Sequence, residues 1–224
     1  MPVLAELFTS EGCSSCPPAD LLLEHLDRNQ PVHGALVIAL SEHVDYWDRL
    51  GWKDPYSSAV PTWRQQTYGQ RFRLNSVYTP RMVIDGREQV LGKHTSAVQA
   101  AVARAAASPR LQVMVSGTAR EAGGVRFTVE ASQLPSKSDS KRADVWVALA
   151  DDRVQSEVSW GENSGRRLIH VAAVRKLVKV GEVTRTTGFR QELRLRGGAG
   201  AARIIAVVQQ QHLGPVAGVG MAKF

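Results

Sequence analysis

The two cysteines of this chain of 224 residues stand close together, as Cys13 and Cys16 in the segment Cys-Ser-Ser-Cys. They follow the apolar run of residues 3–9, which is typical of a buried strand, and Pro17 and Pro18 open a helical pattern after them. A Cys-x-x-Cys pair between a strand and the start of a helix is the arrangement used for thiol–disulfide exchange. Because a helix N-terminus favours thiolate over thiol, we expect Cys13 to be the nucleophile. Cys16, one turn further along, would resolve the mixed disulfide.

Two other uses of the cysteine pair are less favoured. A structural zinc site needs four ligands, and the sequence contains no second pair of cysteines. A purely structural disulfide would close a loop of a few residues, for which the entropic gain from cross-linking is smallest. Redox or thiol chemistry is therefore the favoured interpretation.

Glu6 is a charged residue inside the apolar run that precedes the cysteines. Burial disfavours the charged form of a carboxyl group, so we expect the pKa of Glu6 to be raised. A carboxylate of this kind beneath the cysteines could accept the proton of Cys16 during exchange. An equally favoured alternative is that Glu6 has a backbone or arginine partner and is structural.

A second group of candidates follows the apolar run of residues 35–40, at the sheet edge where open α/β proteins bind ligands. His43 could tune Cys13, or it could complete a metal-binding set with both cysteines, and thiolates with imidazole suit Cu(I). A hydrogen-bonded histidine that fixes the loop is the favoured alternative. Trp47 is a candidate for substrate contact, although packing beneath the loop is favoured for the tryptophans of this segment.

The apolar periodicity predicts a mixed order of elements in the first half of the chain. A helix is expected directly after the cysteines, and Asp85-Gly86 is a strong hairpin signal. This order of elements is that of the thioredoxin fold. The other expected elements are strands at 3–9, 35–40, 81–84 and 89–91 and helices at 61–74 and 95–107.

The second half of the chain has a different pattern. Short segments with alternating or β-branched residues, separated by Gly, Ser and Pro, are typical of a β-sandwich. Residues 1–108 carry 10 Lys and Arg against 11 Asp and Glu, while residues 109–224 carry 18 against 10. We therefore expect an α/β thioredoxin-like domain at 1–108, followed by an all-β sandwich-like domain at 109–224. Its strands are expected at 111–116, 125–131, 144–150, 189–195 and 203–209.

Composition and charge exclude several classes of protein. The net charge is +7, but the basic residues are scattered, which favours a solvated basic face over a nucleic-acid partner. No apolar stretch approaches the ~20 residues of a membrane-spanning helix, so we expect no membrane span. Met1-Pro2 leads straight into the first strand pattern, so no signal peptide is expected in this chain.

A polar run precedes the apolar positions Leu168, Ile169 and Val171. It could contribute a contact between the two expected domains, although a β-turn with a solvated flank is the favoured interpretation. The run comprises Glu162, Asn163, Arg166, Arg167 and His170.

Thr79 and Pro80 stand directly before the expected hairpin. In thioredoxin-like proteins a Thr-Pro dipeptide with a cis bond enters this strand, packs beside the cysteines and pairs through its backbone with a substrate chain. By this resemblance we expect a cis bond here, with an ordinary trans proline before an edge strand as the alternative. Tyr78 and Arg81 flank the dipeptide and are further candidates for substrate contact.

Several motifs extend the resemblance over nearly the whole chain. They are residues 6–20, His43-Val44-Asp45-Tyr46-Trp47, Leu50-Gly51-Trp52, Tyr78-Thr79-Pro80 and Gly161-Glu162-Asn163. Together they resemble a bacterial family of exported thioredoxin-like proteins, domain-of-unknown-function family 1223. The resemblance implies a periplasmic or secreted location. Arg81 stands where the family pattern leads us to expect Gln.

We expect a thiol–disulfide oxidoreductase that uses Cys13 and Cys16 on exported proteins or small thiols, with no cofactor beyond the redox-active disulfide. Protein thiols or disulfides are the expected partners. One alternative is a Cu(I)-binding protein or metallochaperone that uses Cys13, Cys16 and His43. A second alternative is a non-catalytic binding module on a thioredoxin-like scaffold.

Overall fold

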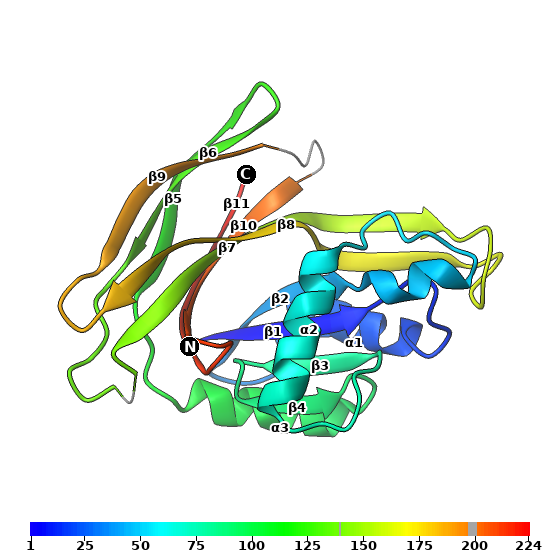
Figure 1. Cartoon of the computed structure of the whole chain (residues 1–224), viewed down its shortest axis with the longest axis horizontal. Helices are drawn as coiled ribbons and strands as arrows, with labels where there is room; N and C mark the ends of the chain where they lie inside the picture. Colours follow the sequence, from blue (N-terminus) through cyan, green and yellow to red (C-terminus); the bar gives the residue numbers. More distant parts are fainter. Residues whose placement is uncertain (139, 197–200) are drawn as a thin grey trace.

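The computed structural model of the chain describes residues 1–138, 140–196 and 201–224 (Figure 1). Within these residues the main element is a sheet of eight strands in the order β11-β10-β7-β8-β2-β1-β3-β4, and a second sheet has the order β5-β6-β9. The strands are β1 (Pro2–Thr9), β2 (Leu36–His43), β3 (Arg81–Ile84), β4 (Glu88–Leu91), β5 (Val113–Glu121), β6 (Gly124–Ala131), β7 (Arg142–Glu157), β8 (Arg167–Thr184), β9 (Phe189–Arg196), β10 (Ala201–Gln210) and β11 (Val216–Lys223).

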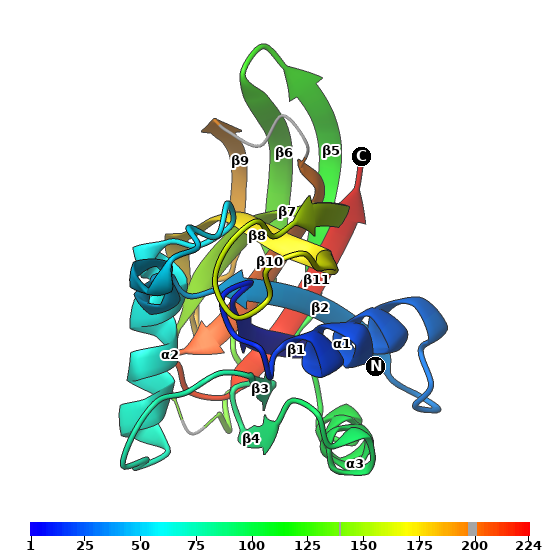
Figure 2. The same ribbon diagram turned by 90° about the vertical axis from the view of Figure 1, so that its right-hand side faces the viewer.

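Helices cover both faces of the β1–β4 end of the large sheet (Figure 2). Alternate residues of β1 point to opposite faces, so Ala5 and Leu7 pack with the helices α1 and α3, while Leu4 and Phe8 pack on the face that carries α2. None of the helices in the described residues is long and apolar enough to cross a membrane. The helices are α1 (Pro17–Asn29), the 3-10 helix η1 (Asp45–Leu50), α2 (Ala59–Arg71) and α3 (Thr95–Ala106).

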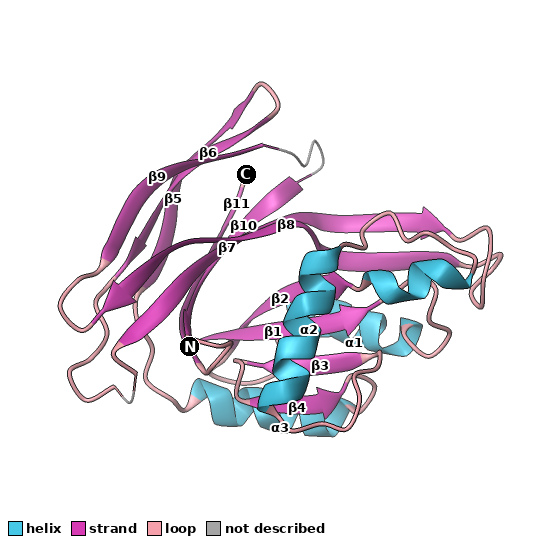
Figure 3. Ribbon diagram, viewed as in Figure 1, coloured by secondary structure: helices cyan, strands magenta, loops and turns pink. Residues whose placement is uncertain are grey.

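The other end of the large sheet packs against the three-stranded sheet, away from the helices (Figure 3). Strand β7 serves two cores because its side chains alternate: Val145 and Val147 face the three-stranded sheet, while Trp146 and Ala148 join the core beneath α2. The three apolar cores therefore lie on one continuous sheet.

The expected fold class, an α/β thioredoxin-like domain followed by an all-β sandwich-like domain, is wrong. Strands from both halves of the chain form one large sheet, because β8 pairs with β2 at Ala173 and Ser41. The molecule is a mixed α/β protein built on this eight-stranded sheet, with the three-stranded sheet packed on one end. The boundary expected between 108 and 109 falls in the connection from α3 to β5, and the division of the chain there stays a prediction.

Most individual elements are confirmed within a few residues, including the hairpin of β3 and β4, but β8 and β11 were not expected and β7 is much longer than expected. The pairing of β7 with β8 shifts register between Leu149 and Ala150, which leaves Arg175 as a bulge between Val174 and Lys176. A bulge breaks the alternation of period two by which a strand is identified from sequence. The charged pair Arg175-Lys176 lies at this bulge, so the sequence pattern does not indicate β8, the longest strand among the described residues.

A buried polar network joins α2 to strands from both ends of the chain. Arg64 donates from Nε to Glu6 Oε1 of β1 at 2.6 Å and from Nη2 to Gln209 Oε1 of β10 at 2.8 Å. The Tyr68 hydroxyl donates to Glu6 Oε2 at 2.7 Å. Glu42 lies 3.4 Å from Arg64, and burial together with the nearby Glu6 raises its pKa well above the ordinary range despite the arginine. Arg64 is therefore the cation of this network, and its shortest carboxylate contact is with Glu6.

Arg64→Ala is expected to lower the free energy of unfolding by about 3–5 kcal/mol, because it leaves the buried Glu6 carboxylate without its cation. Denaturant unfolding measures this loss. Arg104→Ala is the matched control, since Arg104 pairs with Glu88 at the surface, where the side chains are 59% and 43% exposed. Its removal should change stability by about 1 kcal/mol or less. Equal losses in the two variants would contradict the structural role of the network.

Candidate functional site

Cys13 and Cys16 form a disulfide in the loop between β1 and α1, with their Cα atoms 5.4 Å apart. Cys16 is the N-cap of α1, and its carbonyl accepts the backbone N–H of Ala19 at 2.8 Å. Both cysteines are 0% exposed, whereas Ser14 and Ser15 between them face solvent. The pair thus sits at a helix N-terminus, as expected, but its sulfur atoms are covered.

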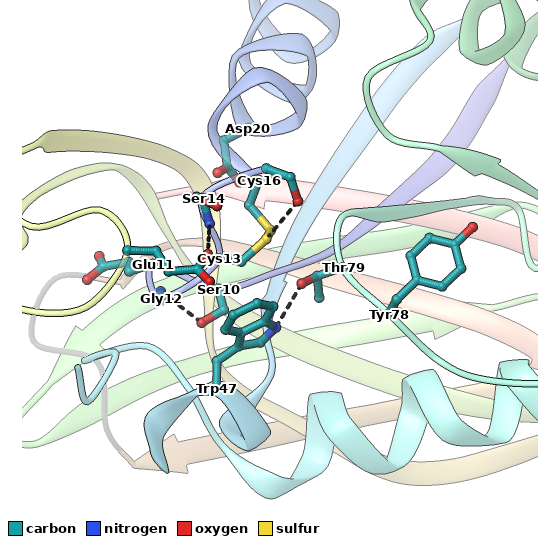
Figure 4. The surroundings of a disulfide bond; sticks show 12 residues. Ser10, Glu11, Gly12, Cys13, Ser14, Cys16, Asp20, Trp47, Tyr78 and Thr79 are labelled. Atoms are coloured by element: carbon teal, nitrogen blue, oxygen red, sulfur yellow. Dashed lines mark hydrogen bonds between the residues drawn. A yellow bond between two sulfur atoms is a disulfide. The ribbon is translucent and has the colours of Figure 1, made fainter. Parts of the chain in front are cut away.

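Trp47 and Thr79 lie beside this loop (Figure 4). The Trp47 indole N–H donates to Thr79 Oγ1 at 2.9 Å, and a Cβ atom added at Gly12 would lie 3.4 Å from Trp47 Cβ. The bond between Thr79 and Pro80 is cis, and both residues are buried. The structure therefore brings Trp47, Thr79 and Pro80 together with the cysteine loop.

The residues that flank the dipeptide lie differently. Tyr78 is 43% exposed, and its ring points away from the disulfide (Figure 4). The guanidinium of Arg81 lies 4.1 Å from the centre of that ring, and its Nη1 donates to Gln89. Arg81 is thus held against Tyr78 and β4, and the two residues form one unit at the edge of the site.

Glu6 is not placed with the cysteines. Its side chain is on the face of β1 that carries α2, where Arg64 and Tyr68 bind both of its carboxylate oxygens. The helix that begins at Cys16 packs on the opposite face. Of the two roles expected for Glu6, the geometry favours the structural one.

His43 is also fully buried, and both of its ring nitrogens have partners. Nδ1 lies 2.7 Å from Asp54 Oδ2, and Nε2 lies 3.2 Å from Ser41 Oγ. Burial alone would raise the pKa of Asp54, but the pairing with His43 and backbone N–H donors lower it to about 2. Within the described residues no three His, Cys, Asp or Glu are grouped so that they could hold a metal ion. The geometry thus favours the loop-fixing role of His43, and no observation supports the Cu(I) alternative.

A second buried histidine, His170 of β8, was missed as a site residue by the sequence reasoning. Its Nε2 lies 3.3 Å from Glu11 Oε1 and its Nδ1 3.7 Å from Asp20 Oδ1, and its ring meets that of His43 edge to face. Burial would lower the pKa of His170, but the interactions with Asp20 and Glu11 outweigh it and raise the pKa to about 10. An imidazolium therefore lies between two carboxylates that flank the cysteine motif in sequence. The sequence around His170 did not indicate that its side chain is buried, because a solvated polar turn has the same composition as this run.

The turn between β7 and β8 docks on the cysteine loop. Asn163 is fully buried, and its side-chain amide donates to the carbonyls of Glu11 at 2.8 Å and Cys13 at 2.9 Å. The backbone N–H of Ser14 donates to Glu162 Oε2 at 2.9 Å. The solvated turn favoured from sequence holds for Glu162, Arg166 and Arg167, which are exposed, but Asn163 and His170 are buried, and the run also contacts the first half of the chain.

The fold and the site define a mixed α/β protein with a buried Cys-x-x-Cys disulfide that is covered by a turn from the second half of the chain. The model of the family described as "Protein of unknown function (DUF1223)" matches residues 4–209, and the chain belongs to this family. No curated protein sequence matches the chain.

Two solved structures are similar to the whole chain. The crystal structure of protein AGR_C_4864 from Agrobacterium tumefaciens has a TM-score of 0.74 at 24% identity, over 99% of this chain and 93% of that one. HBP35 of Porphyromonas gingivalis has a TM-score of 0.65 at 13% identity, over 100% of this chain and 75% of that one. At these identities the likeness shows a shared fold, and it supports the continuous mixed α/β arrangement in place of the expected fold class.

Asn163→Ala is expected to lower the free energy of unfolding by about 1–3 kcal/mol, because buried carbonyls lose their amide donor. It should also speed the reduction of the disulfide by dithiothreitol, since the turn no longer holds the loop. Ser164→Ala is the control in the same turn, because its hydroxyl makes one exposed hydrogen bond to the carbonyl of Ser159. A control that behaves like Asn163→Ala would contradict a specific role for Asn163.

The stability of the protein is expected to fall as the pH rises between 6.5 and about 10, the ordinary pKa of His170 and its folded value. A pKa raised in the folded state gives stability that is complete below the unfolded pKa and is lost as pH passes the folded pKa. Denaturant unfolding at several pH values measures the loss, which should reach a few kcal/mol. His170→Gln should remove this slope, and the exposed His25→Gln should retain it. A slope that survives His170→Gln would refute the assignment.

Proposed function

We propose that the chain is a thiol–disulfide oxidoreductase that exchanges electrons with protein or small-molecule thiols through Cys13 and Cys16. The observation that carries the proposal is the disulfide between these two residues, with Cys16 as the N-cap of α1. A helix N-terminus stabilises a thiolate, which is the attacking and leaving group in exchange. A disulfide that closes so short a loop contributes little stability, so a structural role explains it poorly.

The exchange balances in two steps with a dithiol substrate. A substrate thiolate attacks Cys13 Sγ, the Cys13–Cys16 bond breaks, and Cys16 leaves as a thiolate that takes a proton. The second substrate thiol then loses its proton and attacks the substrate sulfur of the mixed disulfide, which releases Cys13. Two electrons and two protons pass from the substrate to the pair, and the reverse sequence reduces a substrate disulfide.

Access to the sulfur atoms is the main physical requirement of this function. Both cysteines are 0% exposed, and Trp47 lies over Gly12 while bound to Thr79. Trp47 is partly exposed and packs against Gly12 of the cysteine loop. We place the substrate chain along Thr79 and Pro80, where displacement of Trp47 gives it a path to Cys13.

The location of this activity is part of the proposal. The resemblance to exported proteins supports a periplasmic or secreted location.

Cys13→Ser and Cys16→Ser are expected to behave differently with insulin or a disulfide-bonded peptide. Both should abolish turnover with dithiothreitol as electron donor, but Cys16→Ser retains the nucleophile and should accumulate a mixed disulfide through Cys13. Mass spectrometry under non-reducing conditions identifies the adduct. Equal adducts in the two variants would contradict the assigned roles. Absence of turnover in the wild type would refute the oxidoreductase and leave the binding module as the explanation.

A further inference from the structure

The turn between β7 and β8 forms hydrogen bonds with the backbone of the cysteine loop. Figure 1 shows this connection, in yellow, at the same end of the sheet as the start of α1. Glu162 accepts the N–H of Ser14, the residue that follows Cys13. Backbone N–H groups next to the first cysteine are the donors that would otherwise stabilise its thiolate after reduction. Glu162 therefore competes with the thiolate for this donor and holds a carboxylate at the residue next to Cys13.

Other charged groups around the loop come from α1, β8, the segment after η1 and the β7–β8 turn, and carboxylates outnumber cations among them. His170 lies between Glu11 and Asp20, so one cation is shared by two carboxylates. The Asp54 carboxylate accepts the N–H of Glu11 and pairs with His43. Of the cations of the turn, Arg167 pairs with the Glu157 carboxylate at 3.0 Å, whereas Arg166 donates to the neutral amide oxygen Asn163 Oδ1 at 3.1 Å and keeps its positive charge. Arg81 of β3, at the edge of the site, lies against the Tyr78 ring.

An excess of carboxylates disfavours a further negative charge, and a thiolate is such a charge. A Cys-x-x-Cys protein becomes a strong oxidant when its reduced form is stabilised, chiefly as a thiolate. Carboxylates around this pair offset the stabilisation that the N-terminus of α1 gives a thiolate, so the disulfide form is favoured and the reduced pair gives up its electrons readily.

We propose that Glu162 is a positioning residue that disfavours the Cys13 thiolate, and that it sets the pair to reduce substrate disulfides rather than to oxidise thiols. This inference rests on the proposed exchange function and gives it a direction. A dithiol donor first reduces the Cys13–Cys16 bond. The Cys13 thiolate then attacks a substrate disulfide, one substrate sulfur leaves and takes a proton, and Cys16 resolves the mixed disulfide. The substrate gains two electrons and two protons as the pair is reoxidised.

The ionisation of Cys13 tests the first part of the proposal. The pH dependence of alkylation of the reduced protein by iodoacetamide, read on the Cys13 peptide, should give a thiol pKa at or above the ordinary value of about 8.5. Glu162→Gln keeps an oxygen acceptor for Ser14 but removes the charge, and it should lower that pKa by on the order of half a unit. Glu192→Gln makes the same change of charge on the three-stranded sheet and should leave it unchanged. A wild-type value below about 7 would overturn the proposal.

The equilibrium of the cysteine pair with dithiothreitol tests whether the pair is set to act as a reductant. The two proteins are compared at the same pH, so the pH dependence of dithiothreitol itself cancels. Wild type and Glu162→Gln should be equally reducible at pH 6, where no thiolate forms. At pH 9 the variant should be about threefold more reducible, or about 14 mV at roughly 30 mV per tenfold change. If Glu162 had a purely structural role, its substitution would change the equilibrium with dithiothreitol equally at pH 6 and at pH 9. That result would refute the charge effect.

These measurements need no substrate, so they test the role of Glu162 independently of the proposed exchange function. Lack of insulin turnover together with the expected pKa shift would refute the exchange function, and with it the direction assigned here. Turnover together with an unchanged pKa in Glu162→Gln would refute the role of Glu162 and leave the exchange function standing.

Discussion

The pairing of β8 with β2 at Ala173 and Ser41 is the joint on which the rest of the structure depends. It joins strands from both halves of the chain into one sheet, and it fixes where the start of β8 and the preceding turn can lie. From this joint the chain brings His170 against His43 and Asn163 against the carbonyl of Cys13, which is 150 residues away in sequence. Without β8 beside β2, the β7–β8 turn would not cover the cysteine loop. Glu11 and Asp20 would then lack the imidazolium of His170.

The same joint makes the surroundings of the disulfide a property of both halves of the chain. The cysteines, Glu11 and Asp20 come from one short segment, but the groups that balance or oppose their charges, His170 and Glu162, come from β8 and its turn. A charge beside a sulfur atom acts on the thiolate and not on the disulfide, since the disulfide carries no charge. The second half can thus set the chemistry of the pair without contributing a cysteine.

Features that depend on neighbours in sequence were predictable, and features that depend on distant pairing were not. The strand, the Cys-x-x-Cys pair and the prolines of α1 are contiguous, so local patterns located the disulfide, and the hairpin around Asp85 and Gly86 followed from turn chemistry. The fold class failed because no local pattern says which strands pair across the chain, and because the bulge at Arg175 concealed β8. The turn itself was expected, but the burial of Asn163 against the cysteine loop was not, because exposed and buried polar turns have the same composition.

Glu6 is buried close to the cysteines in sequence, but the alternation of side chains along β1 places it on the other face of the sheet. A buried carboxylate just before a Cys-x-x-Cys motif looks like a proton acceptor when only the sequence distance is considered. Side chains of a strand alternate between faces, so Glu6 points to α2 while Leu7 points to α1, the helix that starts at Cys16. Arg64 and Tyr68 therefore bind Glu6 on one face, and the ionisable groups around the cysteines are those of the loop, α1, β8 and the β7–β8 turn. The face of the sheet, and not the burial of the carboxylate, decides which acid can take part in the chemistry.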